Sequence, residues 1–331
     1  MAPYIVFNKK MFRFDVSKIK AMVNNKYTFY MTGRILAAVV FVLLTCGKVF
    51  SQSITPQDME KFQIMEDSMV VTSDSMYDAF ISDDHVIYSE RFAKQLVRAL
   101  KIPNSYYYPF DKLKDKINII YSDDNTFRIF NWAIMPTPAT KHYYGAIQLP
   151  SEKLKLFGLR DYTDELGKGA EDSILTGGKW FGAIYYRIMS HEVEGHKIYT
   201  LFGLNSSSPI SNKKVLDPLT IDEHGVIFGA PIFGVVSENF PKLRINRFIL
   251  EYKKEVQVFM NWDQERQVIV FDRLVSQMND PHRKYTYVPS GEYDGFRWAN
   301  DMWNYLRDLL PIKILHDGEQ PLQDDKPQGN K

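Results

Sequence analysis

The stretch "SHEVEGHKIYTLFG", residues 190–203, decides between two very different folds for this chain. Its two histidines, His191 and His196, flank acidic residues and resemble the H-E-x-x-H pattern of zinc hydrolases. That pattern places its histidines four residues apart, so that both imidazoles lie on one face of a helix. Here the spacing is five residues, which would leave the two side chains about 140° apart around a helix. The spacing therefore argues against a zinc-binding helix.

The residues on either side of the histidines favour a β-hairpin. "AIYYRIM" precedes them and "KIYTLFGL" follows, and both are rich in β-branched and aromatic residues. Gly195 can adopt the positive φ that a tight hairpin turn requires. A turn at this point places Glu192 opposite Lys197, which is a favourable pair across two strands. We expect a hairpin tip at which the histidines are incidental and no metal is bound.

The alternation seen in this hairpin continues along most of the chain. From about residue 117, apolar residues recur with a period of two, and turn-forming residues separate the segments. Short links between successive strands favour antiparallel pairing. The segments predicted to be strands include "TFRIFNWAI", "KHYYGAIQL", "WFGAIYYRIM", "HKIYTLFGL", "VIFGAPIF", "RFILEYKK", "VQVFMNW" and "QVIVFDRL".

Residues 55–101 have helical periodicity instead. Thr55 followed by Pro56 is typical of a helix N-terminus, with proline at the first helical position. We expect a second helix capped by Ser89 and ended by Pro103. Its apolar stripe consists of Phe92, Leu96, Val97 and Leu100.

These patterns predict an α+β protein in which N-terminal helices pack on a large, mostly antiparallel β-meander of about ten or more strands. A sheet of that size curls or splits into two packed sheets. The predicted organisation is a signal peptide over 1–51, a helical segment over 52–112, a β-rich region of the same domain over 113–311, and a disordered tail over 312–331.

The N-terminal prediction rests on the apolar run "ILAAVVFVLLTC", residues 35–46. Twelve residues are too few to span a bilayer but suit the core of a signal peptide. Small side chains occupy the positions three residues and one residue before the peptide bond that follows Ser51. We therefore expect the signal peptide to be cleaved after Ser51. A compact signal peptide also begins at Met31, which is an alternative start of translation. Lipid attachment at Cys46 is an alternative to simple release.

Removal of residues 1–51 changes the charge and the chemistry of what remains. That segment holds eight of the 41 Lys and Arg and one of the 40 Asp and Glu, so 33 bases and 39 acids are left, a net charge of −6. An acidic chain without a basic cluster argues against nucleic-acid partners and anionic membranes. Cys46 is the only cysteine, so the processed chain has no disulfide or thiolate chemistry. We expect no cofactor and no transmembrane span.

Paired carboxylates provide the catalytic alternative. "NWDQE" (261–265) and "SGEYDGFRW" (290–298) place acids beside aromatic residues, and a glycosidase uses two carboxylates in such surroundings. Acids in turns between aromatic strands are also common in proteins without catalytic activity. The candidate catalytic residues are Asp263, Glu265, Glu292 and Asp294.

The runs "FRIFNW", "YYGAIQL", "WFGAIYYRI", "KIYTLFGL", "SNKKVLDPLTID" and "RFILEYKKEVQVFMNWD" carry a resemblance. Over about residues 117–300 the chain resembles a group of exported bacterial proteins of unknown function. The resemblance implies a signal peptide, a helical N-terminal part and a β-rich C-terminal part. It also implies that 187–199 is a strand pair without fixed histidines. It transfers no catalytic residue and no activity.

The sequence therefore predicts an exported bacterial protein, periplasmic or extracellular, of a non-catalytic binding or structural type. Its expected partner is a glycan or another component of the cell envelope. The alternative is a hydrolase that acts on glycans or envelope polymers through the paired carboxylates.

Overall fold

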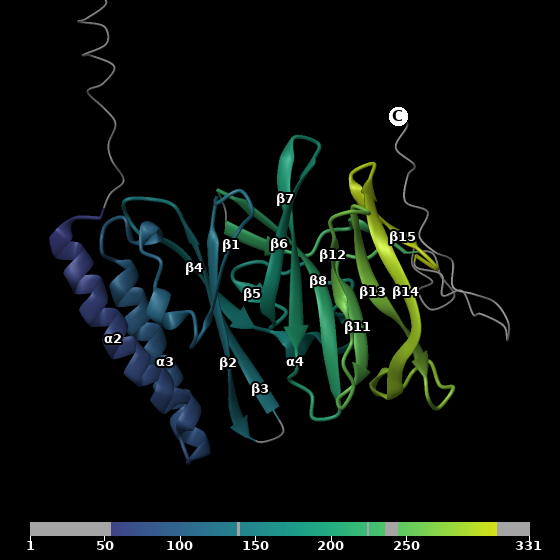
Figure 1. The fold of residues 1–331 in the computed structure, drawn as a ribbon, viewed down its shortest axis with the longest axis horizontal. Coiled ribbons are helices and arrows are strands. Elements are labelled where there is room, and N and C mark those ends of the chain that lie inside the picture. The colour runs from purple at the N-terminus through teal and green to yellow at the C-terminus, as the bar shows by residue number, and fades with distance from the viewer. Residues whose placement is uncertain (1–53, 138–139, 224, 236–243, 310–331) are drawn as a thin grey trace, which may run out of the picture. The chain divides into compact units, whose positions relative to one another are not determined.

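Two helices open the part of the chain that the computed structural model describes, which is residues 54–309 except 138–139, 224 and 236–243 (Figure 1). The predicted signal peptide and the predicted tail over 312–331 lie outside the described residues. Helix α2 runs over Pro56–Asp78, and the Thr55 hydroxyl caps it by accepting the N–H of Asp58 at 3.1 Å. The N-terminus predicted from Thr55 and Pro56 is therefore confirmed.

The predicted start of the second helix is wrong. Helix α3 covers Ser82–Leu100, so Ser89 lies in its interior. There the Ser89 hydroxyl is buried and accepts the indole N–H of Trp132 at 2.9 Å. A tertiary hydrogen bond thus occupies the Ser89 side chain, which sequence patterns assign to a helix cap. Acidic residues in the first turn of α3 favour a start of the helix at Ser82.

Within the described residues, the strands form three five-stranded sheets. The helix-side sheet has the order β1-β2-β3-β4-β5, the middle sheet has β11-β8-β7-β6 with β9 beside β8, and the outer sheet has β10-β15-β14-β13-β12. Neighbouring strands are antiparallel except for the pairs β4–β5 and β10–β15. The predicted α+β class with mostly antiparallel strands is confirmed, but the strands divide into three sheets and not into one or two.

The bounds of the strands are as follows. The helix-side sheet contains β1 (Asn118–Tyr121), β2 (Arg128–Thr137), β3 (Thr140–Leu149), β4 (Lys155–Asp161) and β5 (Lys179–Trp180). The middle sheet contains β6 (Ile184–Val193), β7 (His196–Asn205), β8 (Ser211–Asp222), β9 (Gly225–Phe228) and β11 (Phe248–Lys253). The outer sheet contains β10 (Phe233–Gly234), β12 (Met260–Asp263), β13 (Val268–Ser276), β14 (Tyr287–Ala299) and β15 (Met302–Leu306). Short helical turns are α4 (Thr163–Leu166) and the 3₁₀ turns Ser105–Tyr107, Asp111–Leu113, Gly167–Gly169 and Lys284–Thr286.

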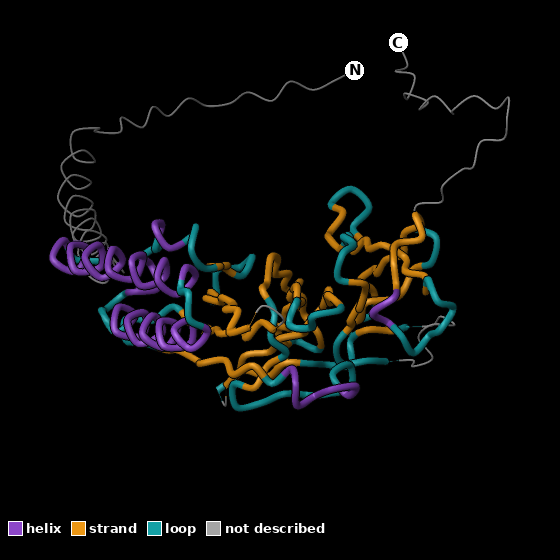
Figure 2. The backbone as a smooth tube through the Cα atoms, turned by 90° about the horizontal axis from the view of Figure 1, so that it is seen from below, coloured by secondary structure: helices purple, strands orange, loops and turns teal. Residues whose placement is uncertain are grey.

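Three hydrophobic cores separate four layers: the helices, the helix-side sheet, the middle sheet and the outer sheet (Figures 1 and 2). Strand β7 explains the stacking. Tyr199 and Leu201 face the core shared with the helix-side sheet, whereas Ile198 and Phe202 face the core shared with the outer sheet. Because side chains alternate along a strand, the run "IYTLF" buries both faces, and two sheets pack against one.

The hairpin of residues 190–203 joins β6 to β7. Val193 lies opposite His196, and the two turn residues Glu194 and Gly195 have φ of 50° and 80°. Positive φ at both positions is the geometry of the tightest hairpin turns. Glu192 lies opposite Lys197 as the spacing predicts, but the Lys197 ammonium group pairs with Asp124 at 2.5 Å.

A fully buried ion pair lies within the core of the middle sheet. The Arg247 Nε donates to Asp217 at 2.7 Å, and the Tyr185 hydroxyl donates to the other carboxylate oxygen at 3.0 Å. Arg247 also donates to the Ala170 carbonyl at 2.6 Å. Burial raises the pKa of Asp217, and the Arg247 charge and the hydrogen bonds oppose that rise. The pair therefore depends on mutual neutralisation.

Candidate functional site

The structure does not bring the four predicted carboxylates together. Asp263 ends β12 opposite Val268, and Asp294 on β14 lies opposite Phe271. Phe271 faces the core between the middle and outer sheets, and Val268 is three positions from it. Since directly opposed residues share a face and faces alternate along a strand, Asp263 and Asp294 lie on opposite faces. Glu265 is exposed in the turn between β12 and β13.

Asp294 and Glu292 belong to an ionic network around Arg273. The Arg273 Nε donates to both oxygens of Asp294 at 3.0 and 3.1 Å, and its guanidinium also pairs with Glu292. The hydroxyl of Tyr305 donates to Asp294 as well. Hydrogen bonding to Asp294 raises the pKa of Arg273, and burial raises that of Tyr305. This network fixes β14 against β13 and β15.

The two histidines lie in different surroundings. His196 is exposed, whereas the His191 ring stacks on Trp298 with centroids 4.1 Å apart and meets Trp303 edge-on at 4.9 Å. The Nε2 of His191 is buried and has no hydrogen-bond partner among the described residues. Burial lowers the pKa of His191 to about 4. His191 is therefore an aromatic contact between the middle and outer sheets, contrary to its expected incidental role.

Of the four predicted acids, Asp263 lines a pocket of about 700 Å³ at the β12 edge of the outer sheet, together with Trp262 and Tyr293 from the same two sequence segments. Most of its walls are outward-facing residues of that sheet. The Phe259 carbonyl accepts the backbone N–H of Asp272 at 3.1 Å, and the Phe259 N–H donates to the Asp272 carboxylate at 2.6 Å. Asp272 is opposite Tyr293 in the ladder. These three side chains form one row across the sheet.

The next row provides the floor of the pocket. Asn261 lies opposite Val270, and Val270 lies opposite Gly295. Phe259 is 50% exposed, and Tyr293 is half-buried. The pocket therefore combines accessible aromatic rings with a small apolar floor and flanking polar groups. Its volume lies in the range of small-molecule sites.

The two carboxylates of this pocket are tuned in opposite directions. The backbone N–H and the guanidinium of Arg266 hold the pKa of Asp263 below its ordinary value. Burial raises the pKa of Asp272, although the Phe259 N–H donates to it at 2.6 Å. Val268, opposite Asp263, is four residues from Asp272 along β13, which corresponds to about 13 Å between backbone positions. A retaining or inverting glycosidase places its carboxyl groups about 5–9.5 Å apart.

Sequence patterns missed Phe259, Asn261 and Asp272 as members of this site. All three lie in the segments "VQVFMNW" and "QVIVFDRL", which were predicted as strands. Following the period of two beyond Asp263 would have placed Phe259 and Asn261 on its face, and the same rule links Asp272 to Val268. The register of β12 on β13, which the sequence does not specify, brings Phe259 and Asn261 to the same pocket as Asp272.

A second cavity of about 660 Å³ lies between the loop after β4, strands β8 and β11, and the loop before β14. Its walls include charged side chains of both signs, among which Lys284 pairs with Glu171 at 3.9 Å. The Glu251 carboxylate accepts the hydroxyl of Ser211 at 2.7 Å. Two aromatic residues, Phe181 and Tyr285, contribute to it. Its mixed charges make it a less specific site for an uncharged ligand.

Comparison of the chain with protein-family models, with curated proteins and with solved structures gave no match. Across the described residues, no group of three or more His, Cys, Asp and Glu side chains is arranged to hold a metal ion. Nor does any helix in the described ranges have the length and apolar character needed to cross a bilayer.

Proposed function

We propose that the protein is exported from a bacterial cell and acts in the periplasm or cell envelope as a non-catalytic binding protein for saccharides. The observation that carries the proposal is the row formed by Phe259, Asp272 and Tyr293 at the mouth of the 700 Å³ pocket. The pocket is a preformed concave site that combines aromatic walls with a few polar groups, which is the usual composition of a ligand site.

Saccharide chemistry fits this lining. A sugar ring presents an apolar C–H face, which packs against aromatic rings, and hydroxyl groups at its edge. Carboxylates and amide side chains accept or donate hydrogen bonds to hydroxyls. Asp263, Asn261 and Gln257 supply such groups around the pocket. The net charge of −6 that remains after residues 1–51 are removed disfavours anionic polymers.

A hydrolase is the second candidate, and one observation favours it. Asp272 has a raised pKa and Asp263 a lowered one, and a catalytic acid and its partner carboxylate require such a difference. The β13 positions of the two carboxylates lie about 13 Å apart along the backbone, so both side chains would have to lean towards each other to reach the spacing of about 5–9.5 Å between the carboxyl groups of a glycosidase. Binding without cleavage is therefore the better-supported function.

The test is a binding and cleavage assay with cell-wall oligosaccharides. We expect binding by the unaltered protein, and Phe259→Ala and Tyr293→Ala should each weaken it about tenfold or more, because each removes a ring that the sugar face covers. Tyr285→Ala is the matched control, since Tyr285 is exposed and lines the other cavity. Equal loss in all three variants, or in Tyr285→Ala alone, would contradict the assignment to this pocket.

Export is tested separately by N-terminal sequencing of protein recovered from the periplasm or medium. We expect the chain to begin at Gln52. Recovery of a chain that retains residues 1–51 would contradict export by cleavage. A lipid-modified chain that begins at Cys46 would support the anchored alternative.

A further inference from the structure

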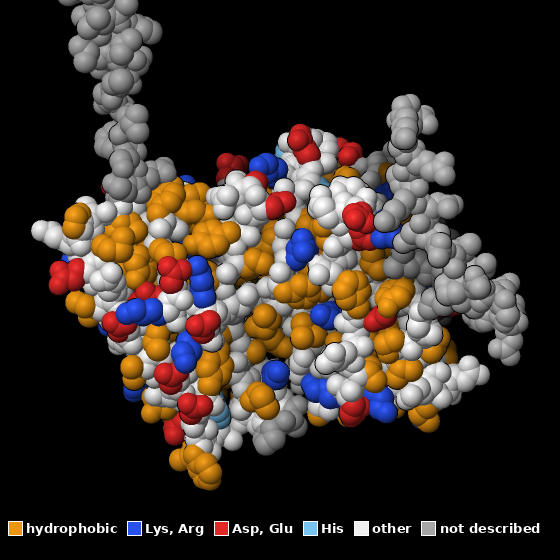
Figure 3. Space-filling model, viewed as in Figure 1, with side chains coloured by type: hydrophobic (Ala, Val, Ile, Leu, Met, Phe, Trp, Pro, Cys, Tyr) orange, Lys and Arg blue, Asp and Glu red, His pale blue; other side chains and the backbone are white. Residues whose placement is uncertain are grey.

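The turn between α2 and α3 presents apolar side chains to solvent. Phe80 is 101% exposed and Ile81 is 59% exposed, and Tyr77 and Ile87 nearby are also exposed. Figure 3 shows hydrophobic side chains at this end of the helices. Leaving a whole phenylalanine side chain in water forfeits the favourable burial of its apolar area. We refer to residues 77–87 as the apolar tip.

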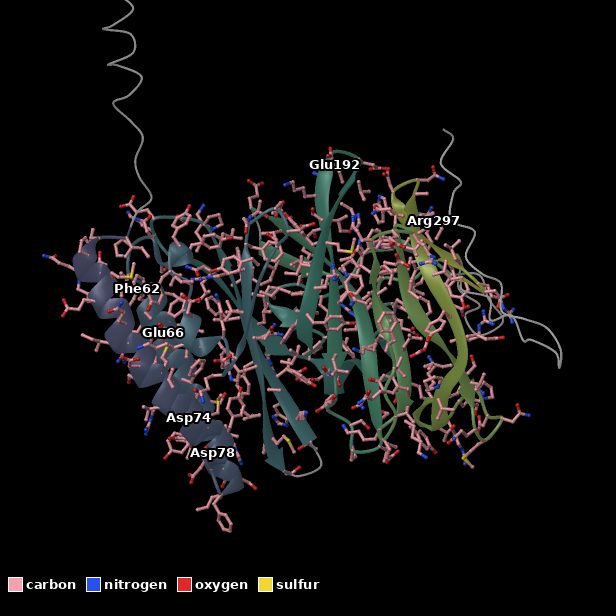
Figure 4. The ribbon with its side chains drawn as sticks, viewed as in Figure 1. Phe62, Glu66, Asp74, Asp78, Glu192 and Arg297 are labelled. Atoms are coloured by element: carbon pink, nitrogen blue, oxygen red, sulfur yellow. The ribbon has the colours of Figure 1, made fainter. Side chains whose placement is uncertain are left out.

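Acidic residues surround the apolar tip. Residues 72–87 contain four aspartates and no lysine or arginine. Figure 4 shows two of them, Asp74 and Asp78, along α2 towards this end. Asp74 pairs with Lys116 at 2.5 Å. The remaining negative charge disfavours an anionic membrane as the surface that covers Phe80 and favours a partner with a basic rim.

A groove with the complementary character lies beside α3 on the outward face of the helix-side sheet. It has a volume of about 300 Å³ and is lined mainly by apolar groups, among them Leu96 and Val97 of α3 and Leu156 and Gly158 of β4. A Cβ atom added at Gly158 would meet nothing within 4 Å. An apolar cavity of about 150 Å³ holds a benzene ring, so the groove has room for the phenyl ring of Phe80.

The charged residue that lines this groove is a cation, Arg160 of β4. The neighbouring helix segment over residues 91–101, which includes the C-cap of α3, adds four lysines and arginines and no acid to this side of the molecule. Two of these cations have exposed acidic neighbours: Lys94 lies 3.7 Å from Glu90, and Arg160 lies 3.9 Å from Glu165. Exposed ion pairs at such distances contribute little free energy. Both cations therefore remain able to attract the acidic residues of the apolar tip.

We propose that the apolar tip of one copy of this chain inserts Phe80 into the groove beside α3 of a second copy. The tip cannot fill its own groove, because Ser82 and Val97 are held on one rigid helix about 22 Å apart. The contact joins two different surfaces, so it is head-to-tail and leaves a free tip and a free groove at the ends of the pair. Copies can then add in series, which gives this protein a structural role beyond saccharide binding.

The test is sedimentation velocity on the purified full chain over a range of concentrations. We expect a mass that rises with concentration and falls with added salt. Phe80→Ser and Arg160→Glu should each weaken self-association about tenfold or more, and both positions are exposed, so folding is preserved. Ile64→Ser is the control, since Ile64 is exposed on α2 but belongs to neither surface.

Mixing the two variants provides the sharpest result. Phe80→Ser retains an intact groove and Arg160→Glu retains an intact tip, so an equimolar mixture should form dimers and nothing larger. A monomeric unaltered protein at about 100 μM, well above the Kd of a specific contact, would overturn the proposal. Self-association unchanged in both variants would overturn it as well. So would Phe80-dependent sedimentation with phosphatidylcholine vesicles in place of self-association.

Discussion

The stability of the contact between the middle and outer sheets should depend on pH through His191. Burial between Trp298 and Trp303 lowers the pKa of His191 to about 4, whereas a histidine in an unfolded chain has a pKa of about 6.5. Between these two values the unfolded chain binds more protons than the folded one, so stability falls as the pH falls. The neutral ring favours the fold, and protonation opposes it.

The size of the effect follows from the two pKa values. Between pH 7 and pH 5 the difference in proton binding corresponds to about 2 kcal/mol of lost unfolding free energy. Asp123 acts in the opposite direction, since its charge favours the protonated ring, and the pKa of about 4 already includes that contribution. Most of the loss should occur below pH 6.5 and should be complete near pH 4.

The assay is urea unfolding of the unaltered protein and of His191→Phe at pH 7, 6 and 5. Phenylalanine keeps a flat ring between the tryptophans but cannot titrate. The unfolding free energy of the variant should therefore fall by about 2 kcal/mol less than that of the unaltered protein over this pH range. Groups that titrate in both proteins cancel in the comparison. Parallel pH profiles for the two proteins would refute the reasoning, as would an NMR titration of His191 with a midpoint near 6.5.

Three further predictions concern stability. Asp217→Ala leaves the buried Arg247 without its partner and should cost about 3–5 kcal/mol in urea unfolding. Gly195→Val should lower the thermal midpoint, because a β-branched residue is strained at φ of 80°, whereas Gly158→Ala should not. Glu66→Leu removes the buried acceptor of the Tyr108 hydroxyl and the Lys112 N–H; calorimetry should detect a loss of about 1–3 kcal/mol.

The elements of this fold could be predicted from the sequence because each has a local signal. Glu194 and Gly195 lie between two apolar-rich segments, and the structure has a tight hairpin there. Thr55 and Pro56 likewise define the start of α2. Ser89 misled because a helix cap and a buried hydrogen-bond acceptor are the same side chain in different surroundings. Which one it becomes depends on Trp132, which is 43 residues away.

The arrangement of the sheets and the membership of the site could not be predicted in the same way. Strand β7 is buried on both faces, and its continuous apolar run does not say how many sheets cover it. The four candidate acids were chosen by proximity in sequence, but strand alternation separates Asp263 from Asp294. Asp272 and Asp263 line the same pocket only because of the register in which β12 pairs with β13.

The most direct test of the central claim is isothermal titration of the protein with cell-wall oligosaccharides, followed by analysis of the recovered sugar. We predict saturable binding that Phe259→Ala and Tyr293→Ala weaken about tenfold, with every oligosaccharide recovered intact. Cleavage of the sugar by the unaltered protein, abolished in Asp272→Asn and in Asp263→Asn, would contradict it and identify the pocket as a hydrolase site.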